Sequence, residues 1–409
     1  MQANKEFDIV VYGATGFTGT LVADYLLERY GCDRDLRWAI AGRSRNKLEA
    51  LREQLGDSAA SLEVLVADSA DEAALADLVR RTRVVITTVG PYALYGSALV
   101  AACVEAGTHY CDLAGEVQWI RRMIDRHHER AGQTGARIVH CCGFDSIPMD
   151  MGVLFLQDEC RRRFDASCES IALFVKATRG SASGGTLASM INIIREARRD
   201  REVARILANP YALNPAGERE GPDGRDQQKV AFDEEAGCWT APFVMAGVNT
   251  RVVRRSHALA GYPYGQEFRY REAVMTGKGP AGWVKGSMMT LALGALVLGI
   301  SFLPTRRLLQ KFFLPSPGEG PGPDARKAGF FNLMQVGTLP DGSTIRTRIT
   351  GDRDPGYGST SKMLAESAVC LAKDELDSPG GVLTPSAAMG SALLKRLRDN
   401  AGLTFDVID

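Results

Sequence analysis

Gly13-Ala14-Thr15-Gly16-Phe17-Thr18-Gly19 stands between an apolar run, FDIVVYG (7–13), and a segment with helical periodicity, TLVADYLLERY (20–30). Glycines in such a loop allow a tight turn and let backbone N–H groups approach a pyrophosphate closely. The dipole of the helix that follows favours the negative charge of the phosphates. The strand, glycine-rich loop and helix together predict a dinucleotide-binding site at all seven residues, 13–19.

The same alternation of apolar run and helical segment continues through the first third of the chain. Such alternation is typical of a parallel sheet with crossover helices, so we predict a six-stranded, doubly wound Rossmann domain over residues 1–150. The further runs are LRWAIAGRS (36–44), LEVLVADS (62–69), RVVITTVG (83–90), THYCDLAG (108–115) and ARIVHCCGFD (136–145).

Residues 151–354 have a different texture, which predicts an inserted α+β domain for the substrate. Strand-like runs alternate there with helical segments, and residues 202–247 are dense in Pro, Gly and charge and predict a long loop. Residues 355–409 predict helices that complete the Rossmann domain. The strand-like runs are ESIALFVKAT (169–178), VNTRVVRRSHAL (248–259), EFRYREAVMT (267–276), FFNLMQVGTL (330–339) and STIRTRITG (343–351).

The composition limits the classes of partner. The 409 residues carry 49 Lys and Arg against 49 Asp and Glu, and this balance argues against nucleic acid as a partner. Nine Cys without a C-x-x-C pair indicate reduced thiols.

The N-terminus lacks the features of a signal peptide, so we expect a cytoplasmic protein. His140-Cys141-Cys142 lies on a strand whose neighbouring side chains diverge, so we expect no metal site. The sequence leaves open whether the protein forms an oligomer.

Residues at the ends of the later strands extend the predicted cofactor site. Arg43 and Ser44 follow the second run, where an NAD-selective protein usually carries an acid, and an Arg there suits a 2′-phosphate. We therefore predict NADP(H); the alternative is a solvated arginine at a helix start. Because ligands collect at the carboxyl ends of parallel strands, we also assign four further residues to the cofactor: Asp68, Ser69, Gly90 and Pro91.

Candidates for proton transfer lie at the same edge of the predicted sheet. No Tyr has a Lys four residues later, so the proton-relay pair of short-chain dehydrogenases is absent. Tyr92, Tyr95 and Asp145 are the catalytic candidates, with Asp112 and Glu116 nearby. The alternatives are a helix cap for Asp145 and packing roles for the two tyrosines.

Two groups in the second domain are candidates for substrate contact. Ser183, Gly184, Gly185 and Thr186 open a predicted helix whose N–H groups suit a carboxylate, thioester or phosphate, although a simple helix start has equal weight. The other group consists of three arginines on the run 248–259, namely Arg251, Arg254 and Arg255. They either bind an anionic headgroup of the substrate or are simply solvated at the surface.

The segment 286–304 has no charge over its 19 residues and is flanked by basic residues. As a helix it measures about 28 Å, close to the thickness of a bilayer core. A single span would put strands of one sheet on opposite sides of the membrane. A helix in the membrane interface, a cover over a lipid-shaped cavity and a fully buried helix stay open. The first two favour a hydrophobic or lipid substrate and a peripheral membrane contact at the inner face.

Several blocks together resemble the saccharopine dehydrogenase-like oxidoreductases, in particular the branch of the mycobacterial trans-acting enoyl reductases and the animal saccharopine dehydrogenase-like protein. The resemblance extends from about residue 7 to the C-terminus. It implies a Rossmann domain, an inserted α+β domain and NADP(H). The blocks are GATGFTG (13–19), AGRSRNKL (41–48), VGPYALYG (89–96), YCDLAGE (110–116), GFDSIPMDMG (143–152), PFVMAGVNTRVVRRS (242–256), DPGYGSTSKM (354–363) and GGVLTPSAA (380–388).

The resemblance leaves the substrate open, since its members include reductases of amino acid conjugates and of lipid or polyketide double bonds. The apolar segment favours the second class, so we expect an NADPH-dependent enoyl reductase of lipid or glycolipid metabolism. The alternatives are a saccharopine-type reductase and a membrane-associated nucleotide-binding scaffold without turnover.

Overall fold

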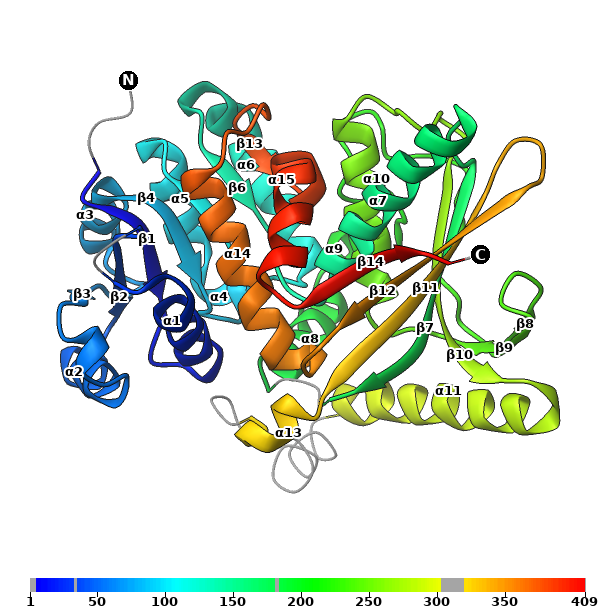
Figure 1. Cartoon of the computed structure of the whole chain (residues 1–409), viewed down its shortest axis with the longest axis horizontal. Coiled ribbons are helices and arrows are strands. Elements are labelled where there is room, and N and C mark those ends of the chain that lie inside the picture. The colour runs from blue at the N-terminus through cyan, green and yellow to red at the C-terminus, as the bar shows by residue number, and fades with distance from the viewer. Residues whose placement is uncertain (1–4, 33–34, 181–183, 303–319, 409) are drawn as a thin grey trace.

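The computed structural model describes residues 5–32, 35–180, 184–302 and 320–408, which form two seven-stranded sheets with helices between and around them (Figure 1). The first sheet is parallel and has the strand order β13-β6-β5-β4-β1-β2-β3, which confirms the predicted doubly wound fold and adds a seventh strand, from the C-terminal segment, to the six predicted ones. Its strands are β1 (Phe7–Tyr12), β2 (Trp38–Gly42), β3 (Glu63–Val66), β4 (Thr82–Thr87), β5 (His109–Cys111), β6 (Arg137–Val139) and β13 (Gly381–Leu383).

Helices cover both faces of the first sheet. In β1, Ile9 and Val11 point to one hydrophobic core and Val10 and Tyr12 to another, as the two-residue period of a strand requires. The first core contains side chains of α1 (Phe17–Tyr30), α2 (Arg45–Gln54) and α14 (Thr360–Lys373). The second contains side chains of α3 (Glu72–Arg81), α5 (Ser97–Ala106) and α6 (Val117–Thr134).

The second sheet has the order β14-β12-β11-β7-β10-β9-β8 and mixes parallel and antiparallel pairs. Its long strands confirm four of the five predicted runs, and the turn after Leu339 joins β11 to β12 as a hairpin, in which Leu339 N donates to Ser343 O. The strands are β7 (Ser170–Arg179), β8 (Ala231–Asp233), β9 (Cys238–Ala241), β10 (Arg269–Gly277), β11 (Phe330–Thr338), β12 (Thr344–Gly351) and β14 (Leu403–Val407).

A layer of helices lies between the two sheets (Figure 1): α7 (Ile147–Phe164), α10 (Ala246–Leu259) and α15 (Pro385–Asp399). The segment 355–409 is divided, because α14 and β13 join the first sheet whereas β14 forms an edge of the second. The remaining elements are η1 (Asp57–Ala59), α4 (Tyr92–Tyr95), α8 (Gly184–Arg199), α9 (Arg201–Ala208), α11 (Gly279–Ser301), α13 (Pro323–Lys327) and η2 (Pro355–Ser359).

The strand predicted over 248–259 is wrong, because this run forms α10. On a helix Arg251, Arg254 and Arg255 share one side, and all three are buried. Arg251 pairs with Asp226 at 2.9 Å and Arg254 with Asp223 at 2.7 Å, while Arg255 donates to backbone carbonyls. They therefore fix the segment that precedes β8, and they are not available to an anionic headgroup.

The segment 202–247 contains more structure than predicted, since all but the first residue of α9 and the whole of β8 and β9 lie within it. The charged residues that favoured a loop are the partners of the buried arginines, as Asp223 and Asp226 show. Their ion pairs give this segment a defined path without a long apolar run.

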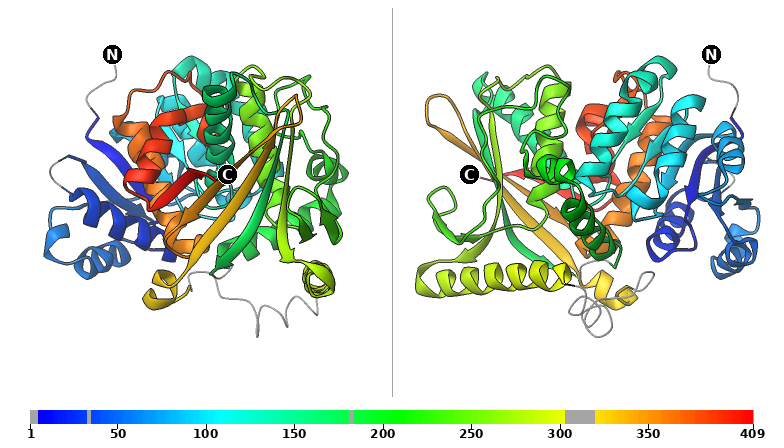
Figure 2. Two further views of the ribbon diagram at one scale, coloured as in Figure 1. Left: turned by 45° about the vertical axis from the view of Figure 1, so that its right-hand side comes forward. Right: turned by 180° about the vertical axis from the view of Figure 1, so that it is seen from behind.

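The helix α11 shows that one interpretation of the segment 286–304, a fully buried helix, is wrong. Residues 303 and 304 of that segment lie outside the described residues. Only 11% of the apolar window of α11 is buried, so it is not a core helix. Among the helices that the structure describes, α11 is the only one long and apolar enough to cross a membrane. However, β10 before it and β11 after it both pair with β7, which excludes a single span. The helix lies along one edge of the molecule (Figure 2).

Candidate active site

One cavity of about 680 Å³ joins the carboxyl ends of the first sheet to the second domain. The Rossmann side contributes the glycine loop and the residues after β4, β5 and β6. The other side contributes β7, α8, the start of α10, α11 and η2. On the Rossmann side the lining includes Gly16, Thr88, Leu113 and Asp145. On the other side it includes Thr178, Met190, Met245, Leu296 and Tyr357. The site thus depends on segments from the whole chain.

The glycine loop has the backbone geometry that a pyrophosphate requires. Gly13 adopts a φ of 86°, and a Cβ on Gly19 would lie 2.2 Å from the carbonyl oxygen of Gly13. Gly16 is the N-cap of α1 and has no side chain to satisfy the first-turn amides, and that turn contains no acid. These N–H groups and the helix dipole fit a dinucleotide phosphate, and Gly16, Phe17 and Thr18 line the cavity.

The second part of the predicted cofactor site lies at the same edge of the sheet. Arg43 and Ser44 follow β2, and Asp68 and Ser69 follow β3, beside the glycine loop. Arg43 is exposed and forms no salt bridge within the described part of the chain, so its charge is available to a 2′-phosphate. Burial raises the pKa of the neighbouring Tyr12 to about 12, and the hydroxyl of this neutral tyrosine donates to the Ala67 carbonyl. Neither strand end lines the large cavity.

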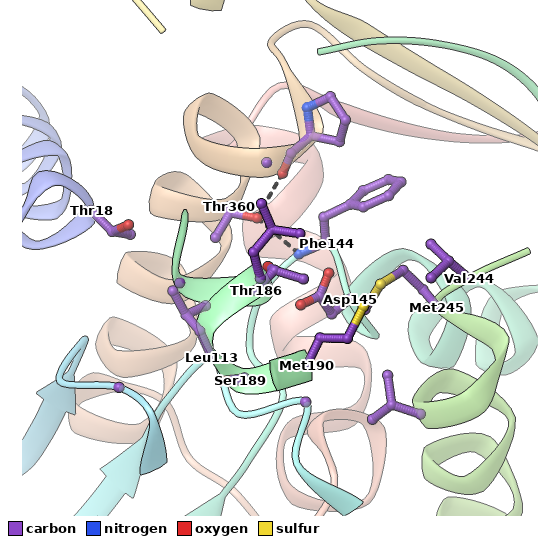
Figure 3. Close-up of a pocket in the computed structure, with 18 of the residues that line it drawn as sticks. Thr18, Leu113, Phe144, Asp145, Thr186, Ser189, Met190, Val244, Met245 and Thr360 are labelled. Atoms are coloured by element: carbon purple, nitrogen blue, oxygen red, sulfur yellow. Dashed lines mark hydrogen bonds between the residues drawn. The ribbon is translucent and has the colours of Figure 1, made fainter. Parts of the chain in front are cut away.

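Asp145 lies inside the cavity, where Figure 3 shows its carboxyl group close to Thr186, Met190 and Met245. It is the only acidic or basic side chain among the described residues that line the cavity. Burial raises its pKa from 3.8 to about 6. The alternative role as a helix cap is wrong, since Ser146 is the N-cap of α7 and no side-chain cap bond forms there. A carboxyl group whose pKa lies this close to neutral pH suits proton transfer.

The two candidate tyrosines differ in position. Tyr92 is buried, lines the cavity and donates its hydroxyl to the Thr87 carbonyl at 3.3 Å, and burial raises its pKa well above the usual value. Tyr95 is 48% exposed on α4, and the cavity lining does not include it. The prediction of Tyr95 as catalytic is therefore not supported.

The other acids of this edge have structural roles. Glu116 accepts hydrogen bonds from the N–H groups of Tyr92 and Ala93 and from the Ser189 hydroxyl at 2.9 Å, so it fixes α8 to the Rossmann domain. Asp112 is fully buried and accepts from Tyr110 and from His140, whose Nδ1 lies 2.7 Å from the carboxylate. The described residues contain no cluster of side chains that fits a metal.

The predicted anion site at the start of α8 is only partly in place. Gly185 and Thr186 line the cavity, whereas Ser183 lies outside the described residues. The N–H of Gly184 donates to the Tyr357 hydroxyl at 3.1 Å, so it is not available to a ligand. Tyr357 belongs to the block DPGYGSTSKM, to which the sequence analysis gave no role. Its ring also contacts Phe17 of the glycine loop, with centroids 4.7 Å apart.

Apolar side chains form most of the wall opposite the strand ends. Met190 and Ile193 come from α8, Met245 from the turn before α10, and Leu293 and Leu296 from α11. Both α11 residues belong to the uncharged segment, so that segment does cover a cavity. The cavity can therefore hold an apolar chain next to the cofactor loop.

Comparisons with known proteins agree with this arrangement. A family model of the saccharopine dehydrogenase NADP-binding domain matches residues 9–139. A putative trans-acting enoyl reductase of Mycobacterium tuberculosis is 44% identical over 406 residues, which cover 96% of each chain. A trans-acting enoyl reductase of Mycobacterium ulcerans is 40% identical over 408 residues, covering 97% of this chain and 96% of that one.

The fold has a counterpart among solved structures. The apo form of a histidine-tagged saccharopine dehydrogenase (L-Glu forming) from Saccharomyces cerevisiae superposes with a TM-score of 0.54 at 13% identity, over 98% of this chain and 100% of that one. The matched N-terminal domain is an NADP-binding domain, so the cofactor is NADP(H), as predicted. With identities of 40% and 44% to these relatives along almost its whole length, the chain belongs to the trans-acting enoyl reductases of the saccharopine dehydrogenase-like family.

Proposed function

We propose that the protein reduces the carbon–carbon double bond of an α,β-unsaturated acyl thioester with a long apolar chain, using NADPH. One observation carries the proposal: a single cavity contains the nucleotide loop, one carboxyl group and an apolar wall. The names of the relatives support the choice of reaction. The apolar wall from α8 and α11 supports the choice of a lipid or polyketide chain.

Residues of the Rossmann edge would hold the cofactor. The first-turn amides of α1 would bind the pyrophosphate, and Arg43 would bind the 2′-phosphate. NADPH supplies a hydride for the β-carbon of the double bond. Gly90, Pro91 and Leu113 would then border the reactive end of the cofactor, because they follow β4 and β5 next to the loop.

Asp145 would deliver the proton. When the β-carbon gains a hydride, the α-carbon needs one proton, and the balance is NADPH plus a proton plus the enoyl group giving NADP⁺ and the saturated acyl group. Among the described residues that line the cavity, Asp145 has the only carboxyl group, and its pKa of about 6 leaves part of the population protonated near neutral pH. It would regain its proton from water. Tyr92, which is fixed by its hydrogen bond, would position the substrate.

The cytoplasm is the expected location. The nine cysteines are all free and eight of them are buried, which fits a reducing compartment that also supplies NADPH. A position of the enzyme at the inner face of the membrane would bring it to an apolar acceptor.

The test is a series of synthetic enoyl thioesters of increasing chain length, added to the protein with NADPH. We expect NADPH oxidation and a saturated product, with kcat/KM rising with chain length. Turnover with saccharopine instead would select the amino acid conjugate chemistry. NADPH binding without oxidation by any thioester would leave a nucleotide-binding scaffold.

A further inference from the structure

The helix α11 presents its large apolar side chains to solvent along its whole length. Leu291 is 73% exposed, Met288 66% and Leu298 62%, values that are unusual for such residues in a folded protein. Other exposed apolar residues of this helix and the residue after it extend the surface: Trp283, Val284, Met289, Val297 and Phe302. We call these eight residues the apolar face of α11.

The opposite side of α11 packs closely against the second domain through small residues. A Cβ on Gly282 would lie 2.1 Å from the Gly277 carbonyl oxygen, and one on Gly286 would lie 2.7 Å from Val230. The Thr276 hydroxyl donates to the Gly282 carbonyl at 2.8 Å. Because only glycine fits at these contacts, the helix cannot rotate to bury its large side chains. The apolar face therefore remains outside.

Basic groups stand at both ends of the apolar face. Lys278 and Lys285 are exposed near the start of the helix. At the other end Arg198 of α8 donates to the Ser301 carbonyl, and its guanidinium lies 5.6 Å from the centre of the Phe302 ring. Residues 279–302 contain no acid. An apolar stripe with cationic ends matches an anionic lipid surface, where long basic side chains reach the headgroups.

The side of α11 opposite Leu291 and Leu298 reaches the cavity. Leu293 and Leu296 line the cavity, and each lies two residues from an exposed leucine, which places it on the other side of the helix. The same helix thus has one side toward the candidate active site and the other toward solvent. In Figures 1 and 2 it lies lengthwise along the margin of the molecule, where a flat surface can reach it.

We propose that the apolar face of α11 docks the enzyme on an anionic lipid bilayer, with the helix parallel to the membrane, and that the acyl chain of the acceptor enters the cavity beside α11. The entry of the acceptor rests on the proposed function. The strands before and after α11, β10 and β11, both pair with β7 in one sheet, so α11 cannot cross the membrane as a single span. A protein partner is disfavoured because a protein interface has a polar rim, whereas this stripe is apolar across its exposed width.

The experiment is flotation of the full chain with vesicles of phosphatidylcholine, with or without phosphatidylglycerol. The wild type floats with the anionic vesicles. A double variant, Leu291→Asp with Leu298→Asp, leaves the bound fraction lower by about tenfold or more, because each charge must enter the apolar layer. It retains NADPH binding, since neither residue lines the cavity. Lys278→Glu with Lys285→Glu lowers binding to the anionic vesicles only.

A matched control is Leu94→Asp with Phe164→Asp, which adds the same charge at two exposed apolar positions of α4 and α7. It should float like the wild type. Two outcomes overturn the proposal: a wild type that floats with neither vesicle, and a wild type whose dimer, measured by light scattering, is dissociated by the α11 variant, which would show that a second copy covers this face.

Reduction of a short, water-soluble enoyl thioester, measured in parallel, separates this proposal from the proposed function. Turnover without flotation rejects the lipid docking alone. Flotation without turnover of any thioester rejects the enoyl reductase and, with it, the entry of an acyl chain.

Discussion

The two walls of the cavity are built in different ways. The nucleotide wall comes from a continuous loop, 13–19, and from strand ends that follow one another along the chain. The acceptor wall combines α8, α10, α11 and η2, whose residues are separated by up to about half the sequence. Glycines and backbone amides dominate the first wall, and methionine and leucine side chains dominate the second. Local chemistry thus fixes the cofactor, while tertiary packing selects the acceptor.

The largest effect is expected at the nucleotide wall, from Gly19→Val. Its Cβ would collide with the Gly13 carbonyl and with Ala14 Cα at 2.8 Å, both of which are backbone atoms. We expect loss of NADPH binding in calorimetric titration and a free energy of unfolding lower by about 3 kcal/mol or more.

Gly224→Ala is the control for the glycine variant, since a Cβ there meets nothing within 4 Å. It should bind NADPH as the wild type does. Normal NADPH affinity in Gly19→Val would contradict the close packing of the loop on α1.

The next effect concerns the residue where the two walls meet, Asp145. Asp145→Asn should lower kcat by roughly 10²- to 10⁴-fold, the usual contribution of a positioned acid, and leave NADPH affinity unchanged. Wild-type kcat should fall as the pH rises above about 6, where Asp145 loses its proton. A variant with full activity and the wild-type pH profile would exclude Asp145 as the proton donor.

The same substitution has a predicted effect on stability. The folded protein holds the proton of Asp145 more tightly than the unfolded chain, because the pKa is raised from 3.8 to about 6. The ionised carboxylate therefore destabilises the fold above pH 6, and this effect disappears as the pH falls toward 4. Asp145→Asn should raise the free energy of unfolding by about 1 to 3 kcal/mol at neutral pH. Denaturant titrations of wild type and variant at neutral pH and near pH 4 should show this gain only at neutral pH.

Arg43→Ala tests how the nucleotide wall selects its ligand. Loss of a charge-assisted contact should weaken NADPH binding by about 1.5 to 3 kcal/mol and leave NADH binding nearly unchanged. Arg45→Ala is a matched control, because Arg45 is also exposed but pairs with Glu49 on α2. Equal losses for the two nucleotides would show that Arg43 does not contact the 2′-phosphate.

The smallest effect is expected at the acceptor wall. Leu296→Phe should narrow the cavity and lower kcat/KM for a long enoyl thioester by roughly tenfold, with little change for a short one. Leu298→Phe, two residues later on the outer side, should change neither. If both variants behave alike, the acceptor does not pass α11.

The glycine loop is the part of the nucleotide wall that the sequence predicts most directly. The loop 13–19 sits between its own strand and helix, so its geometry can be inferred from adjacent residues. The run 248–259 misleads, since a strand would put Arg251 and Arg255 on one face and Arg254 on the other. On the helix the three lie together, and the ion pairs of Arg251 and Arg254 form with acids more than 20 residues away, which the run itself does not reveal. Tyr357 and Met245 could not be found, because only the tertiary fold brings η2 and the turn before α10 to the cavity.

Isotope tracing through a single turnover tests the central claim, that both walls serve one reaction. NADPH with deuterium at the transferred position of the nicotinamide is mixed with a long enoyl thioester in ordinary water, and the product is examined by mass spectrometry and NMR. We predict one deuterium at the β-carbon and one solvent proton at the α-carbon, at a rate that Asp145→Asn reduces. Saturated product without deuterium, or deuterium transferred only to an amino acid conjugate, would contradict it.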